Sequence, residues 1–199
     1  MRHLWTAAAL AALLAGCHPQ AASKPPATAP AAAPAVAPKP APTPALSGFS
    51  HAKGEDLFGY YSPDKDVKVG VMQLDQIHIG SEEEFDKWER GERIATYAPV
   101  MLEFSDLSSA KSQDENGVTV YAHTIRVLPT AYKVGGGHLS FTGVDPVLGP
   151  IQLDGEIDMA ALKRAQTESA KDDDIILRAA LQIGTATFKA LTFDWFGGD

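Results

Sequence analysis

The sequence predicts a mainly β domain, either an antiparallel sandwich or a partly open barrel, with about two short helices; an α+β arrangement is the alternative. Two observations predict it. Residues 151–158 alternate apolar and polar side chains with a period of two, as a strand with one solvated face does. Similar runs recur between glycine-containing turns such as Gly135-Gly136-Gly137 and Gly184-Thr185. The segment 49–199 is long enough to form one domain around one hydrophobic core.

The expected strands begin with an alternating run over 67–79, which has a break in phase near Gln73. Its apolar positions are Val67, Val69, Val71, Ile77 and Ile79. A second run is marked by Val100, Leu102 and Phe104. The stretch 117–134 is rich in Val, Thr, Tyr and Ile, and it is long enough for two strands or for one strand bent at Pro129.

The later strands are expected on either side of two turns. Gly135-Gly136-Gly137 separates the stretch 117–134 from 139–143, which predicts a hairpin whose loop needs positive φ angles. After the strand at 151–158, the last two runs cover 175–183 and 187–196 and flank the turn at Gly184.

Two helices are expected to interrupt the sheet. Ser81-Glu82-Glu83-Glu84 is a capping box, and Phe85 and Trp88 are three residues apart, so both would face the sheet before Gly91 ends the helix. The second helix would begin after an N-cap at Asp158 and run toward Ser169.

The N-terminus has the pattern of a secretory signal. Arg2 precedes an apolar stretch over 4–14, which is shorter than the roughly 20 residues of a membrane-spanning helix. Leu14-Ala15-Gly16-Cys17 resembles the lipobox of bacterial lipoproteins. That resemblance implies removal of 1–16, lipidation of Cys17 and acylation of its new amino terminus. The alternative is an ordinary cleaved signal with a cysteine nearby.

The resemblance also implies a location. A residue other than Asp after the lipidated cysteine, here His18, favours the outer membrane with the domain facing the periplasm; inner-membrane retention and surface exposure remain alternatives. Cys17 is the single cysteine of the chain, so its lipidation would leave no thiol for disulfides. The lipid-bearing segment 17–48 is dominated by Pro and Ala and is expected to be a disordered, extended tether.

The charge of the domain bears on its partners. All 25 Asp and Glu follow residue 48, whereas three of the 17 Lys and Arg precede it, so residues 49–199 carry 14 − 25 = −11 formal charges. This balance argues against nucleic acid and against docking on anionic lipid. It favours a basic protein partner, although acidity that serves only solubility explains it equally well.

The sequence contains no recognisable catalytic motif. His78, His123 and His138 fall on separate expected strands without zinc-site spacing, and Glu103, Asp154 and Glu156 lack the context that would mark a catalytic carboxylate pair. Asp172-Asp173-Asp174 would suit calcium only together with a distant carboxylate, because it lacks the spacing of an EF-hand. A solvated acidic loop is the favoured interpretation, so no metal or other cofactor is expected.

Two aromatic pairs are the remaining candidates for binding. Tyr60-Tyr61 follows the tether, and Trp195-Phe196 lies near the last residue. At least one tyrosine ring is expected to be exposed if its segment is a loop or an edge. Adjacent strand residues face opposite ways, so one of Trp195 and Phe196 is expected to point outward. Exposed aromatic rings among acidic residues are typical of interface hot spots. We therefore list as binding candidates Tyr60, Tyr61, Asp172, Asp173, Asp174, Trp195 and Phe196.

Three functional interpretations follow. The first is a lipid-anchored, non-catalytic protein-binding module in the periplasm, such as an inhibitor or immunity protein for a basic toxin or a wall hydrolase. The second is a structural or envelope-assembly lipoprotein, in which the tether is the main functional element. The third is a periplasmic hydrolase whose site is dispersed over several strands.

Overall fold

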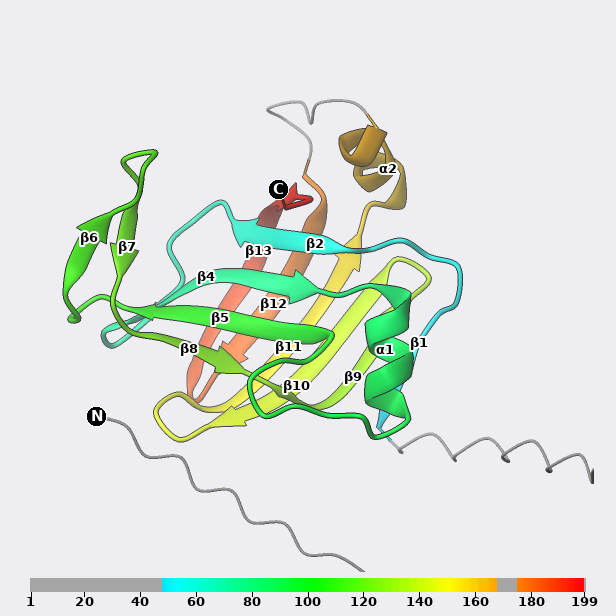
Figure 1. The fold of residues 1–199 in the computed structure, drawn as a ribbon, viewed down its shortest axis with the longest axis horizontal. Coiled ribbons are helices and arrows are strands. Elements are labelled where there is room, and N and C mark those ends of the chain that lie inside the picture. The colour runs from blue at the N-terminus through cyan, green and yellow to red at the C-terminus, as the bar shows by residue number, and fades with distance from the viewer. Residues whose placement is uncertain (1–47, 168–174, 199) are drawn as a thin grey trace, which may run out of the picture. The chain divides into compact units, whose positions relative to one another are not determined.

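The computed structural model describes residues 48–167 and 175–198. A single curled sheet dominates them, with the strand order β1-β9-β10-β11-β12-β13-β2-β4-β5-β8 and β3 paired to β4 (Figure 1). The strands of this sheet are β1 (Phe49–His51), β2 (Gly59–Pro63), β3 (Lys68–Val69), β4 (Met72–Ile79), β5 (Val100–Asp106), β8 (Thr124–Val127), β9 (Pro129–Gly135), β10 (His138–Asp145), β11 (Gly149–Ile157), β12 (Leu177–Ile183) and β13 (Ala186–Phe196). A separate hairpin is formed by β6 (Lys111–Gln113) and β7 (Thr119–Tyr121).

The sheet curls into a half-barrel, and the chain connects its two ends. β8 ends the strand order on one side, and it runs directly into β9, which is next to last on the other side. The chain therefore links both ends of the sheet within a few residues. The pairings are antiparallel apart from that of β1 with β9, among the strands that the structure describes. The prediction of a mainly β, partly open barrel with two short helices is confirmed.

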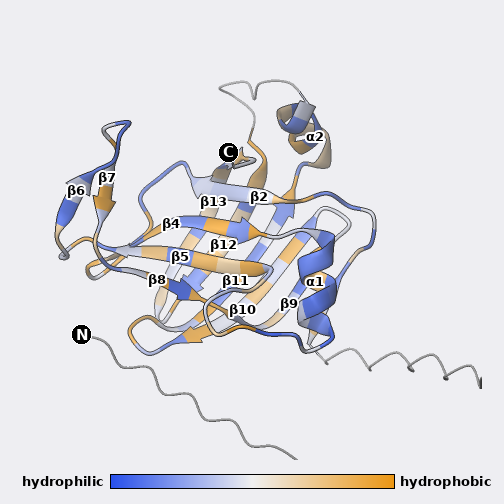
Figure 2. Ribbon diagram, viewed as in Figure 1, coloured by the Kyte–Doolittle hydropathy of each residue, from blue (hydrophilic) through white to orange (hydrophobic). Residues whose placement is uncertain are grey.

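The hydrophobic core fills the concave side of the sheet. β11 and β12 alternate buried and exposed residues along most of their length, as period-two strands with one wet face do. The largest fully buried side chains are contributed by strands from both halves of the sheet: Tyr61, Phe104, Phe141 and Phe193. β5 is largely hydrophobic, whereas α1 (Glu82–Glu89) is mostly hydrophilic (Figure 2).

Both helices form as expected. At the start of α1, the Glu84 carboxylate accepts a hydrogen bond from the Ser81 backbone N–H at 2.7 Å, which completes the capping box. Phe85 and Trp88 are buried in the core. α2 (Met159–Thr167) begins after Asp158, whose Oδ1 accepts from the backbone N–H of Ala161 at 2.9 Å.

Most expected strands are present, but two segments are divided into strands differently from the prediction. The run over 67–79 is two strands instead of one, although β4 has a register shift between Leu74 and Gln76, close to the expected break in phase near Gln73. It is a hairpin of β3 and β4, which turns at Gly70 with φ of 59°, and this turn leaves Val71 half-exposed. The stretch 117–134 contains three strands, namely β7, β8 and most of β9, instead of two strands or one strand bent at Pro129. β1, β2 and β6 had no expected counterpart.

Several predictions concern residues outside the described ranges. They are the lipidated Cys17, the tether up to residue 47, the acidic run Asp172-Asp173-Asp174 and the extension of α2 toward Ser169. These stay predictions from the sequence.

Candidate functional site

A cleft of about 390 Å³ lies on the outer face of β2, β4, β5 and β8. Cross-strand pairing builds its floor in two rows. Phe196 on β13 lies opposite Tyr60, Tyr60 opposite His78, and His78 opposite Met101. In the second row Glu103 lies between Gln76 on β4 and Arg126 on β8. The cleft is lined by Tyr60, Gln76, Tyr97, Met101, Glu103, Arg126 and Phe196.

Glu103 is held by both of its neighbours in the second row. Gln76 Nε2 donates a hydrogen bond to Glu103 Oε2 at 2.5 Å, and Arg126 Nε forms an ion pair with Glu103 Oε1. The Glu103 side chain is 16% exposed and that of Arg126 is 50% exposed. The cleft thus presents a guanidinium group and a fixed carboxylate beside aromatic and thioether surface, a mixture typical of protein-binding sites.

A chain of hydrogen bonds runs beneath the first row. Tyr97 OH donates to Glu84 Oε1 at 2.7 Å and lies 2.7 Å from Nε2 of the buried His78. Because the Tyr97 proton goes to the carboxylate, its oxygen accepts from His78, which places the imidazole proton on Nε2. His78 Nδ1 is then an unprotonated buried atom, and no described group bonds to it.

This environment shifts the pKa values of its members. Burial lowers the pKa of His78 below its ordinary value, because the imidazolium form loses hydration, although Glu84 and Glu103 oppose the shift. Burial would raise the pKa of Glu84, but the hydrogen bonds from Tyr97 and Ser81 outweigh it and the net pKa is lowered. At neutral pH the His78 imidazole is therefore neutral and the Glu84 carboxylate is ionised.

The stability of the protein should depend on pH through His78. In the unfolded chain this group titrates near 6.5, whereas the folded protein excludes the proton until its own lower pKa is reached. The contribution of His78 is thus fully present above pH 6.5 and is lost as the pH falls toward the folded pKa, with a slope of at most about 1.4 kcal/mol per pH unit.

Urea unfolding between about pH 7 and pH 5 checks this expectation. His78→Gln should flatten the decline in unfolding free energy, whereas His123→Gln, at an exposed position, should keep the wild-type slope. If the unfolding free energies of both variants fell equally steeply between about pH 7 and pH 5, His78 would not be the source of the pH dependence.

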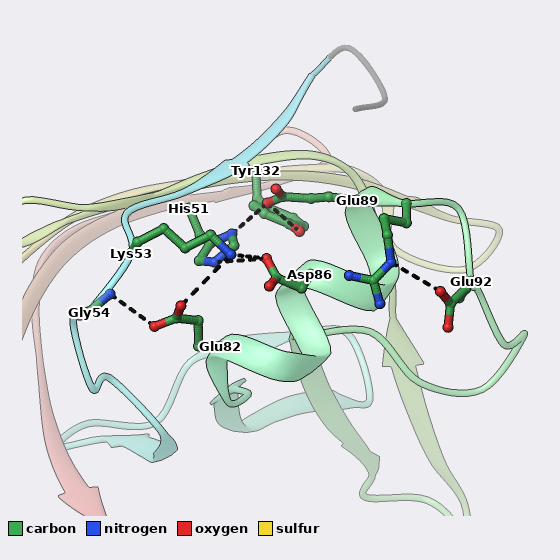
Figure 3. Close-up of polar contacts among 9 residues, drawn as sticks. His51, Lys53, Gly54, Glu82, Asp86, Glu89, Glu92 and Tyr132 are labelled. Atoms are coloured by element: carbon green, nitrogen blue, oxygen red, sulfur yellow. Dashed lines mark hydrogen bonds and ion pairs between the residues drawn. The ribbon is translucent and has the colours of Figure 1, made fainter. Parts of the chain in front are cut away.

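A second polar cluster attaches α1 to β1 and β9 (Figure 3). His51 Nδ1 lies 2.9 Å from Glu89 Oε1, which also accepts from Tyr132 OH at 3.1 Å. His51 Nε2 is 3.6 Å from Asp86 Oδ1, and Lys53 also pairs with Asp86. The His51 side chain is 4% exposed and stacks on Phe85 with ring centroids 4.9 Å apart. We interpret this cluster as a structural attachment, because its imidazole is shielded from ligands.

The structure separates the aromatic candidates. Tyr60 and Phe196 meet in the cleft, whereas Tyr61 is fully buried in the core and has no surface with which to contact a partner. Trp195 is partly buried, and its indole N–H donates to the Phe58 carbonyl at 3.0 Å. Asp172, Asp173, Asp174 and Cys17 lie outside the described residues.

Other cleft residues were not singled out by the sequence. Tyr97 comes from the loop between α1 and β5, where no periodicity marks it, and the positions of Gln76, Met101 and Arg126 depend on strand register. Glu103 was considered only as a catalytic carboxylate. It lies on β5 beside Arg126, whereas Asp154 and Glu156 lie on β11.

Residues 48–167 and 175–198 contain no group of three or more His, Cys, Asp or Glu arranged to hold a metal ion. In the same ranges neither helix has the length and apolarity needed to span a bilayer. Comparison with protein-family models, with curated proteins and with solved structures finds no match for this chain.

Proposed function

We propose that this protein is a lipid-anchored bacterial envelope protein whose β domain binds a protein partner through the cleft on β2, β4, β5 and β8. The observation that carries the proposal is the cross-strand pairing of Tyr60 with Phe196, both of which line this cleft. Phe196 is 55% exposed, and large exposed aromatic side chains at a concave, partly polar site are favoured anchors of protein interfaces.

The chemistry of the cleft favours a segment of polypeptide as the ligand. Tyr60 and Phe196 offer ring faces to apolar or cationic side chains, and Met101 adds a flexible apolar surface. Gln76, Glu103 and Arg126 provide donors and acceptors for backbone amides. The net charge of −11 over residues 49–199 supports a basic partner, whose approach it would accelerate at low salt.

Site-specific photo-crosslinking in the cells that make the protein tests this proposal. A photoreactive amino acid in place of Tyr60 should give one discrete adduct with a basic protein, and the yield should fall as salt rises. The same residue in place of Gln152, which is exposed on the outer face of β11, is the matched control and should give no such adduct. Identical adducts from both positions, or none from position 60, would contradict the proposal. An adduct with envelope-assembly machinery would favour a structural role instead.

The anchor is tested independently of the cleft. Cys17→Ser removes the thiol that the lipid would modify, so the variant should move from the membrane fraction to the soluble periplasmic fraction. The expected change is large, because several acyl chains on one protein hold it almost irreversibly. Cell fractionation followed by immunoblotting measures it. A variant that stays in the membrane fraction would contradict lipid anchoring at Cys17.

A further inference from the structure

A second pocket, separate from the partner-binding cleft, lies at the C-terminal end of α1. Its volume is about 650 Å³, within the range of small-molecule sites. Trp88, Ile94 and Pro99 give it apolar walls. Its charged groups are those of Lys87, Arg93, Glu84 and Glu92. Tyr97 lines this pocket as well as the cleft, so its ring belongs to the wall between them.

One wall residue has an unsatisfied hydrogen-bond donor. Trp88 is 5% exposed, and its Nε1 is buried without an acceptor among the described residues. A buried N–H that has lost its water and gained no partner is costly, so such groups are rare in folded proteins. Trp195 makes an instructive contrast, because its indole N–H donates to the Phe58 carbonyl at 3.0 Å. An acceptor brought by a ligand would satisfy the Trp88 donor.

Arg93, a second residue of the pocket wall, has a positive charge that faces aromatic rings. The Arg93 guanidinium lies 4.5 Å from the ring centroid of Phe49 and 4.8 Å from that of Trp88. Stacking of this kind fixes the guanidinium plane and leaves its N–H groups able to donate hydrogen bonds to a ligand. Arg93 forms no ion pair within the described part of the chain. The neighbouring cations are already paired, Lys87 with Glu83 at 2.7 Å and Arg90 with Glu92 at 3.1 Å.

We propose that this pocket binds a small organic anion in which a single carboxylate is attached to an apolar body. The carboxylate would accept hydrogen bonds from the Arg93 guanidinium, and a turn of the adjacent Trp88 ring would bring its buried indole N–H within reach of the same carboxylate. The apolar body would cover Ile94, which is 60% exposed, and Pro99. Glu84 and Glu92 in the wall repel a second negative charge, and Lys87, the other cation of the wall, is paired with Glu83, so a carboxylate fits this site better than a phosphate dianion.

Indole N–H resonances of the full-length protein in detergent micelles test this site. N-acetyl-leucine is the probe, and N-acetyl-leucinamide is its uncharged counterpart with the same apolar body. We expect saturable movement of the Trp88 resonance, assigned with Trp88→Phe, while the Trp195 resonance stays in place. The amide should bind at least about tenfold more weakly, because it lacks the charge that Arg93 recognises.

A matched pair of variants completes the test. Arg93→Gln should weaken binding of the probe by about tenfold or more, whereas Arg90→Gln, a nearby arginine that does not line the pocket, should bind as the wild type does. Equal binding of acid and amide, or no movement of the Trp88 resonance, would overturn the proposal. Inorganic phosphate that displaces the probe at equal concentration would also overturn it, because the site would then select anions in general. If Arg93→Gln fails to fold, the comparison of acid with amide on the wild type still decides.

Discussion

Gly135→Ala is expected to lower the free energy of unfolding by about 3–5 kcal/mol. Gly135 has φ of 140°, a conformation that side chains rarely adopt. A Cβ at this position would lie 2.2 Å from the Cβ of Ala52. Ala52 has little freedom to move away, since its backbone N–H donates to the Val134 carbonyl at 2.8 Å. Chemical denaturation of the purified protein measures the loss.

Gly136 provides the matched control for Gly135. It lies in the same β9–β10 turn with φ of 64°, but a Cβ there would meet no atom within 4 Å. Gly136→Ala should therefore cost only the strain of the left-handed conformation, about 1–2 kcal/mol. If both variants lose the same stability, the close approach of Ala52 is not the reason for glycine at 135.

Tyr61→Ala is expected to lower the free energy of unfolding by about 3–5 kcal/mol, because it empties a fully buried site in the core. The hydroxyl group contributes part of this loss, since Tyr61 OH donates to the Leu57 carbonyl at 2.8 Å. Tyr61→Phe should retain the packing and lose about 1–2 kcal/mol. Denaturant titration of the two variants separates packing from the hydrogen bond.

The neighbouring tyrosine should behave in the opposite way. Tyr60 lies on the outer face of β2 and lines the cleft, so Tyr60→Ala should change stability by less than about 1 kcal/mol. It should also abolish crosslinking of the partner from an exposed cleft position such as Arg126. Loss of folding in Tyr60→Ala, or partner binding that survives it, would contradict the division of the pair into a core residue and a surface residue.

Local signals in the sequence predicted much of the secondary structure. The capping box of α1 and the alternation of β11 each lie within a few residues, so their physical causes are visible in the sequence. The three-residue β1 is too short to show a period, and it pairs in parallel with β9, far along the chain. The turn at Gly70 was missed because Val71 continues the alternation of apolar residues.

The candidate site was harder to predict because it depends on register between distant strands. The sequence marked Tyr60 and Phe196 as aromatic but not as neighbours, since their contact depends on β13 pairing with β2. Likewise, the ion pair of Glu103 with Arg126 requires β8 to lie beside β5 in one particular register. Propensity and periodicity describe single strands and carry no information on such pairings.

The pairing of β2 with β13 also constrains the order of events during folding. Trp195 donates to the carbonyl of Phe58, 137 residues earlier, and the central strands of the sheet cannot be completed before both segments are available. Contacts at this separation slow folding, because a long loop must close before they form. A chain that emerges from its N-terminus during synthesis would therefore leave β2 without its β13 neighbour until the last strand is made. For this topology the pairing of β13 with β2 comes last, so the domain cannot reach its native form until the C-terminal strand is available.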